Sequence, residues 1–212
     1  MQFNSIGFLF CFLPLFLILY YCAKEKLQTP ILIIGSLLFY GLSAGDQYWW
    51  VVLLVVITGA SYFVQRRLEK PKATGVFVLW IVLLSGILIF LKVYAGGKYL
   101  PAGVSFYLFQ IAAILADVYR GKVSSYESAS VFFRDIAMFP KLLSGPLMDP
   151  RELQLQIRYP RPRFEDLREG LLILIPGLAM KVLIANRLGG LWAQTAGIGY
   201  GNISTPFAWL GL

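Results

Sequence analysis

The sequence has 212 residues, of which 58% are hydrophobic and 14% are charged, and its formal net charge is +8. Five stretches carry no charged residue, namely residues 1–23, 27–45, 47–65, 73–91 and 99–116. A helix needs ~20 apolar residues to cross a bilayer, so these stretches favour an integral membrane protein over a soluble helical one. The basic residues occupy short loops between apolar runs, which argues against a nucleic-acid partner and indicates membrane orientation instead.

The apolar runs predict membrane-spanning helices at residues 3–22, 29–45, 47–65, 73–94, 102–118 and 169–189. The first run has no basic start and no small-x-small cleavage site before Lys24, so we expect it to be a retained span. Pro30, Pro71 and Pro101 stand at span entrances, where a missing N–H costs little. The predicted fold is therefore an all-α polytopic bundle of about six to seven spans, an estimate from hydropathy.

The loop charges predict which way the bundle faces. The odd-numbered loops carry lysines and arginines, namely Lys24, Lys26, Arg66, Arg67, Lys70, Lys72, Arg120 and Lys122. The loop after the second span has none, and the loop after the fourth has only Lys98. Because basic loops stay in the cytoplasm, we expect the odd loops to be cytoplasmic and the N-terminus to be external.

Residues 128–168 break the simple pattern of spans. Residues 128–148 are apolar but are interrupted by Arg134, Asp135 and Lys141 and broken by Pro140 and Pro146. If they crossed the bilayer, the five arginines between residues 151 and 168 would face outward, against the charge bias. We therefore expect residues 128–148 to enter the membrane and return as a re-entrant segment, or to lie along its inner face, followed by a cytoplasmic loop that extends to residue 168.

Polar residues within the apolar runs are candidates for function. Gly103, Gln110 and Asp117 lie seven residues apart and so share one helix face, and Asp117 can pair with Arg120. That face fits either a polar wall along a substrate path or a hydrogen-bonded seam between helices.

Two lysines lie in apolar surroundings. Lys141 must pair or extend its amine to the interface. Lys181 lies eleven residues into the last run, beyond a predicted kink at Pro176, and is either a mid-membrane functional residue or a lysine near a shifted boundary.

Several chemistries lack the residues that they need. The sequence contains no histidine, which removes any Ser–His or Cys–His pair. Cys11 and Cys22 would lie ~16 Å apart on one helix, too far for a disulfide, and without histidine a zinc site is not expected. We therefore assign no catalytic residue, no metal ligand and no cofactor.

Six motifs in order resemble the membrane-bound O-acyltransferase family, in the branch of the alginate O-acetylation and teichoic-acid D-alanyl transfer proteins. They are FNSIGFLFCFLPLFLILYY, ILIIGSLLFYGLS, LPAGVSFYLFQ, DVYRGK, MFPKLLSGPLMDPREL and GLAMKVLIANRLG. The resemblance implies a helical bundle around a tunnel and transfer of an acyl group, often acetyl, to a hydroxyl of a polysaccharide or similar acceptor. It also implies that residues 1–212 are the N-terminal part of a single transmembrane domain, incomplete at the C-terminus, because the family's signature histidine belongs to a later half.

By resemblance, the candidate tunnel residues are Ser105, Phe106, Gln110, Asp117, Arg120, Pro140, Lys141, Gly145, Pro146 and Lys181. The expected partners are the lipid bilayer, an acyl-CoA or acyl-carrier-protein donor on the cytoplasmic side, and an external acyl-transfer partner. The expected location is a bacterial inner or plasma membrane, and the isolated chain is expected to be inactive. A transporter or flippase component and a non-catalytic scaffold of exopolysaccharide assembly remain as alternatives.

Overall fold

The computed structural model describes residues 3–45, 47–70, 73–94, 103–143, 145 and 164–196. The elements in this described part of the chain are all helical. The chain divides into two compact units, Met1–Pro160 and Arg161–Leu212. Each unit is described by itself below.

The described residues of the first unit form the π-helix η1 and seven α-helices: η1 (Gly7–Phe12), α1 (Leu13–Cys22), α2 (Glu25–Ala44), α3 (Trp49–Leu68), α4 (Thr74–Tyr94), α5 (Val104–Tyr119), α6 (Ala129–Ala137) and α7 (Phe139–Leu142). Those of the second unit form a continuous helical run of α9 (Phe164–Ala179), η2 (Met180–Ala185) and α10 (Asn186–Ala196). A helix therefore lies at each of the six apolar runs, and the prediction of an all-helical fold is confirmed for the described residues.

Four of these helices are long and apolar enough to cross a membrane: Glu25–Ala44, Trp49–Leu68, Thr74–Val93 and Glu165–Ala193. The apolar helices Gly7–Cys22 and Val104–Tyr119 are shorter. The outer face of α4 is covered by exposed apolar side chains such as Leu79, Val82 and Phe90, and this is the surface that a membrane helix presents to lipid. The chain is thus a membrane protein, while its number of crossings stays a prediction.

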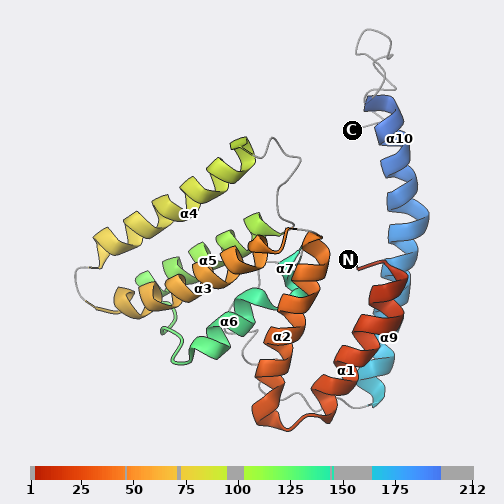
Figure 1. The fold of residues 1–212 in the computed structure, drawn as a ribbon, viewed down its shortest axis with the longest axis horizontal. Helices are drawn as coiled ribbons and strands as arrows, with labels where there is room; N and C mark the ends of the chain where they lie inside the picture. Colours follow the sequence, from red (N-terminus) through yellow and green to blue (C-terminus); the bar gives the residue numbers. More distant parts are fainter. Residues whose placement is uncertain are drawn as a thin grey trace. The chain divides into compact units, whose positions relative to one another are not determined.

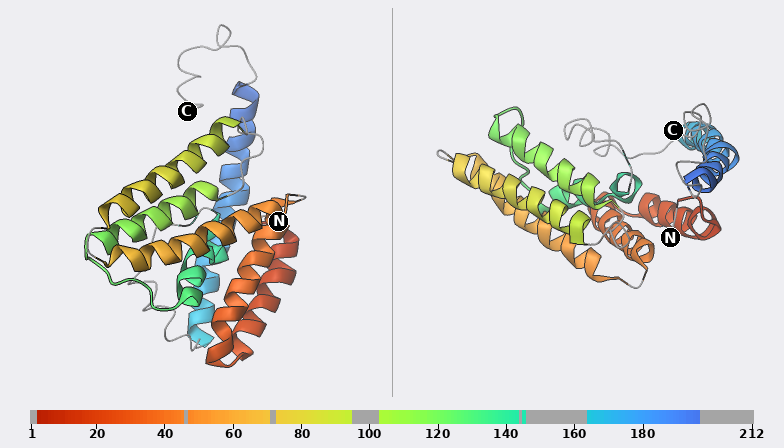
Figure 2. Two further views of the ribbon diagram at one scale, coloured as in Figure 1. Left: turned by 60° about the vertical axis from the view of Figure 1, so that its left-hand side comes forward. Right: turned by 90° about the horizontal axis from the view of Figure 1, so that it is seen from above.

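Helices α3, α4 and α5 run side by side in the first unit, and α6 packs against α2, α3 and α5 (Figures 1 and 2). Helix α5 supplies much of the core, since Ile111 and Leu115 are fully buried. The shortest apolar helix of this layer is therefore enclosed by longer helices.

A second core forms where the N-terminal helix meets α2 and α7. Phe8, Phe12 and Phe16 recur every fourth residue, so they line one face of η1 and α1. The ring of Phe139 in α7 lies 5.0 Å from the ring of Phe16 and 5.4 Å from that of Phe39 in α2. This aromatic cluster joins the first helix to the FPKLLSGP motif.

Two helix boundaries differ from the prediction. Helix α2 begins at Glu25, so Pro30 lies inside the helix rather than at its entrance. The last helical run extends from residue 164 to residue 196, beyond both ends of the predicted span. Hydropathy places a boundary where polar residues begin, but a helix continues for as long as its backbone hydrogen bonds do.

The predicted re-entrant segment contains two short helices. Helix α6 has nine residues and α7 has four, so neither reaches across ~30 Å of hydrocarbon. The chain that would return to the cytoplasmic side, residues 146–163, lies outside the described residues. The re-entrant path and the cytoplasmic loop therefore stay predictions.

Candidate functional site

Charged side chains are buried where α6 and α7 meet the bundle. Arg134 is 8% exposed, Asp135 is 0% exposed and Lys141 is 5% exposed. A charge that leaves water costs free energy unless it is paired and hydrogen-bonded. These residues are therefore the least ordinary part of the described core, and they make the α6–α7 junction the candidate functional site.

The carboxylate of Asp135 is held by its sequence neighbour. Arg134 donates from Nε to Asp135 Oδ1 at 2.8 Å, and its Nη2 lies 2.8 Å from the same oxygen. Gln110 of α5 donates from Nε2 to the main-chain carbonyl of Asp135 at 3.1 Å. The amide of Gln110 thus fixes α6 against α5, which supports a hydrogen-bonded seam at this residue.

Lys141 has no such partner. Its Nζ is buried and has no hydrogen-bond partner among the described residues, so the amine neither forms a close pair there nor reaches solvent. Helix α7 lies outside the candidate spanning helices. Burial lowers the pKa of the Lys141 amine to about 8, with the negative charge of Asp135 opposing the fall and the positive charge of Arg134 adding to it. The Lys141 amine is therefore a buried donor whose hydrogen-bonding capacity is not used among the described residues.

Backbone contacts hold α7 in place. Gly103, which precedes α5, has φ +80°, and a Cβ there would collide with the carbonyl oxygen of Leu142. Phe139 donates its N–H to Ser36 Oγ at 3.1 Å, and the Ser36 hydroxyl donates to the carbonyl of Leu32 at 2.6 Å. The FPKL turn is therefore positioned by a glycine of α5 and a serine of α2.

Three side chains from the last turns of α3 and its C-cap, which we call the clamp, bind the loop that leads into α6. Gln65 accepts a hydrogen bond from the N–H of Tyr126 at 2.9 Å and donates to the Tyr126 carbonyl at 3.2 Å. Tyr62 donates from its hydroxyl to the carbonyl of Glu127 at 2.8 Å, and Glu69 Oε1 accepts the N–H of Ser125 at 2.7 Å. The bonds from Ser125 lower the pKa of the Glu69 carboxyl.

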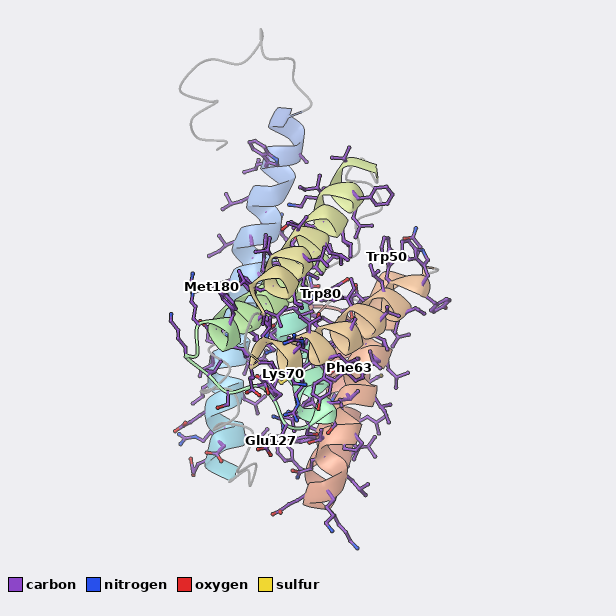
Figure 3. The ribbon with its side chains drawn as sticks, turned by 90° about the vertical axis from the view of Figure 1, so that its left-hand side faces the viewer. Trp50, Phe63, Lys70, Trp80, Glu127 and Met180 are labelled. Atoms are coloured by element: carbon purple, nitrogen blue, oxygen red, sulfur yellow. The ribbon has the colours of Figure 1, made fainter. Side chains whose placement is uncertain are left out.

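The clamp was not predicted from the sequence. Its three members, Tyr62, Gln65 and the C-cap residue Glu69, lie three and four residues apart, so they point to the same side at the end of α3. Figure 3 shows Glu127 on the loop beside this end of the helix. The helical spacing of these three polar residues at the end of an apolar run could have indicated a polar contact surface. The spacing does not indicate which main-chain groups the side chains bind.

The structure brings only some of the predicted tunnel residues together. Gln110, Lys141 and Gly145 lie at the α5–α6–α7 junction, where Gly145 donates its N–H to the Lys141 carbonyl at 3.0 Å. Phe106 is 41% exposed and Pro140 is exposed, so both point away from the core of the first unit. Ser105 is half-buried on α5, and Pro146 lies outside the described residues.

Asp117 and Arg120 lie at the opposite end of α5 from Gly103. Lys122 Nζ lies 3.8 Å from Asp117 Oδ1, so the structure pairs Asp117 with Lys122 rather than with Arg120. The reason is local, because Gly121 at φ +69° ends the helix and turns Lys122 back over its last turn.

Lys181 belongs to the second unit. It is exposed within that unit and lies in η2, after the interior Pro176 of α9. A π-helical turn inside an α-helix often marks a functional position, so the structure adds a local irregularity to a lysine that the sequence had already singled out.

Comparison with known proteins finds relatives named for the O-acetylation of polysaccharides. No family model matches the chain, and no solved structure matches it. The chain is 29% identical over its whole length to the probable alginate O-acetylase AlgI of Pseudomonas aeruginosa, covering 44% of that protein, and 29% identical to the AlgI of Azotobacter vinelandii, covering 46%. It is 25% identical to the peptidoglycan O-acetyltransferase of Helicobacter pylori, over 87% of this chain and 44% of that protein.

The chain therefore spans less than half the length of the curated relatives that it matches. Its similarity to the alginate O-acetylases nevertheless extends from one end of the chain to the other. The resemblance to the membrane-bound O-acyltransferase family, in its alginate O-acetylation branch, is confirmed by these relatives.

Proposed function

We propose that the chain forms part of a membrane-bound O-acyltransferase that transfers an acetyl group to hydroxyls of a polysaccharide. The observation that carries the proposal is the match of the whole chain to alginate O-acetylases, together with a peptidoglycan O-acetyltransferase. Both kinds of relative are named for acetyl transfer to a carbohydrate polymer. The six ordered motifs support the same conclusion from the sequence itself.

In this proposal the chain contributes structure and binding rather than the catalytic base. It contains no histidine, so a base of that kind has to come from outside residues 1–212. The α5–α6–α7 junction would form one wall of the acyl path, with Gln110 fixing α6 and Lys141 turned toward the path as a hydrogen-bond donor to a carbonyl or phosphate oxygen. The donor would be an acyl-CoA or acyl-carrier-protein thioester, reaching this junction from the cytoplasmic side, and an external partner would accept the acyl group.

A chimera tests the proposal directly. The chain would replace the aligned part of the Pseudomonas aeruginosa alginate O-acetylase in cells that lack the native gene, and acetyl esters on the secreted alginate would be measured by NMR. We expect the chimera to restore acetylation, whereas the chain expressed alone should restore none. A chimera that enters the membrane at the native level but leaves the alginate unacetylated would contradict the proposal.

Two substitutions in an active chimera separate binding roles from structural ones. Lys181→Ala should lower acetylation more than it lowers the amount of protein in the membrane. Lys122→Ala, which removes an exposed loop lysine, is the matched control and should change neither. Equal losses of acetylation and protein for Lys181→Ala would make this lysine structural.

A further inference from the structure

The end of α3 presents two different faces. The clamp occupies one of them, and its side chains are hydrogen-bonded to the loop before α6. At about 100° per residue, the next arc of the helix carries Phe63, Arg66 and Arg67 within roughly 100° of one another, and Lys70 follows two residues after the helix ends at Leu68. We call these four residues the basic face. All four are exposed, and the rest of the described chain leaves this face uncovered.

The basic face lines a shallow pocket that is open to the outside. Its four residues and Glu69 line a space of about 390 Å³. Glu69 is the single carboxylate of this lining, and its Oε1 already accepts the N–H of Ser125 at 2.7 Å. The lining contains three basic side chains and one carboxylate, so the net charge of the pocket is positive. Among the described residues, the ion pairs do not include Arg66, Arg67 or Lys70.

The pocket lies where a membrane surface is expected. Helix α3 is one of the helices long and apolar enough to cross, and its two arginines occupy the last turn. Phe63, which is 73% exposed, precedes them by one turn, so in a membrane-crossing α3 its apolar ring would lie about 5 Å deeper than the arginines. Figure 3 shows Phe63 and Lys70 at this end of the helix.

We propose that this pocket binds the headgroup of an anionic phospholipid in the leaflet that the loop charges predict to be cytoplasmic. Arginine side chains bind phosphate oxygens through two parallel N–H groups, and a lysine adds a third positive charge. The ring of Phe63 contacts the first methylene groups of the acyl chain. A lipid satisfies both parts of the pocket, whereas a free phosphate leaves Phe63 without a partner.

The test uses the full chain, purified in detergent and placed in nanodiscs. Retention of phosphatidylglycerol is measured by native mass spectrometry against phosphatidylcholine with the same acyl chains. The variant Arg66→Gln/Arg67→Gln/Lys70→Gln should weaken retention of phosphatidylglycerol by at least about tenfold, since each basic residue near an anionic surface contributes to binding. Arg66→Lys/Arg67→Lys keeps the charge and should lose less than the glutamine variant.

A second triple variant is the matched control. Lys24→Gln/Lys26→Gln/Lys122→Gln removes the same charge from the other two loops on the predicted cytoplasmic side and should leave retention within about threefold of the parent chain. Equal losses in the two triple variants would mean that bulk charge and not the pocket binds the lipid. Competition by inorganic phosphate as strong as that by phosphatidylglycerol would assign a free-anion site and overturn the proposal, as would retention that the α3 variant leaves unchanged.

If the α3 triple variant does not fold, Arg67→Gln and Lys70→Gln are measured separately and each should still weaken retention. None of these readouts involves acyl transfer. The lipid proposal therefore stands or fails apart from the proposed enzymatic function.

Discussion

Lys141 is the residue whose surroundings conflict most with its chemistry. Its amine is buried beside the Arg134–Asp135 pair, yet Arg134 already binds the Asp135 carboxylate. Replacing a buried charge by an apolar side chain of similar length removes the desolvation cost without opening a cavity. The site therefore keeps a group that weakens the fold, which is typical of residues retained for binding.

Lys141→Met should stabilise the chain by about 1–3 kcal/mol. A thermal melt in detergent measures this change. Lys122→Met is the control, because Lys122 is exposed and its ion pair with Asp117 spans 3.8 Å, so its loss should cost at most about 0.5 kcal/mol. A lower melting temperature for Lys141→Met would show that the charge is compensated inside the protein.

The stability of the parent chain should also depend on pH through Lys141. The pKa of its amine is about 8 in the folded chain, below the ordinary value of 10.5. Between these values the unfolded chain binds the proton and the folded chain does not, so stability rises as pH increases through this window. Melting temperatures measured from pH 7.5 to 9.5 should rise in the parent chain and rise less in Lys141→Met.

Two glycines with positive φ offer a matched comparison. Gly103 and Gly121 have φ +80° and +69°, but only at Gly103 would a Cβ meet backbone, that of Leu142. Gly121→Ala should therefore cost about 1 kcal/mol, for the left-handed conformation alone. Gly103→Ala should cost more than about 3 kcal/mol, because α7 has to move. Similar melting temperatures for the two variants would show that α7 does not pack closely against Gly103.

At the scale of elements, the clamp connects α3 to the start of α6. Its spacing on one helix face could be read from the sequence, but its partners are backbone groups more than fifty residues away. Because every residue carries the same main-chain groups, the residues that these side chains bind show no recognisable pattern in the sequence. For the same reason the sequence predicted Gln110 as a polar residue of α5 but not its bond to the Asp135 carbonyl.

Gln65→Ala should destabilise the chain by about 2–4 kcal/mol, since it leaves both the N–H and the carbonyl of Tyr126 buried without their partners. Hydrogen exchange at residues 125–128 should become faster in this variant. Tyr62→Phe removes a single bond at an exposed position and should cost about 0.5–1 kcal/mol. Unchanged exchange in Gln65→Ala would mean that α6 holds the loop without the clamp.

At the scale of the whole molecule, charge-free runs predicted where the helices lie, because a membrane helix has to be apolar along its length. They did not predict boundaries such as the start of α2 at Glu25, where polar residues continue the helix beyond the apolar run. The burial of Lys141 also could not be foreseen, since it depends on how α2, α5 and α7 pack around one turn. Tertiary contacts of this kind leave no local trace in composition.

The orientation predicted from loop charges can be tested by cysteine labelling. In a background with Cys11 and Cys22 replaced by serine, Lys24→Cys, Lys70→Cys and Ser124→Cys should react with a membrane-impermeant maleimide only from the cytoplasmic side, since all three positions are exposed. Gln47→Cys should react only from the external side. Arg158→Cys, beyond the predicted re-entrant segment, should label from the same side as Ser124→Cys. Labelling of these two positions from opposite sides would show that residues 128–148 cross the bilayer.

The clamp also has a consequence for synthesis. Gln65 and the Tyr126 backbone that it binds are 61 positions apart, so α3 leaves the ribosome well before its partner does. Until Tyr126 emerges, the side-chain amide of Gln65 has to be hydrated. Gln65 lies in the last turn of an apolar helix, at the edge of the bilayer, where water is available. Helices α4 and α5 therefore have to be synthesised before the loop can close onto α3, which makes the clamp a late step in assembly.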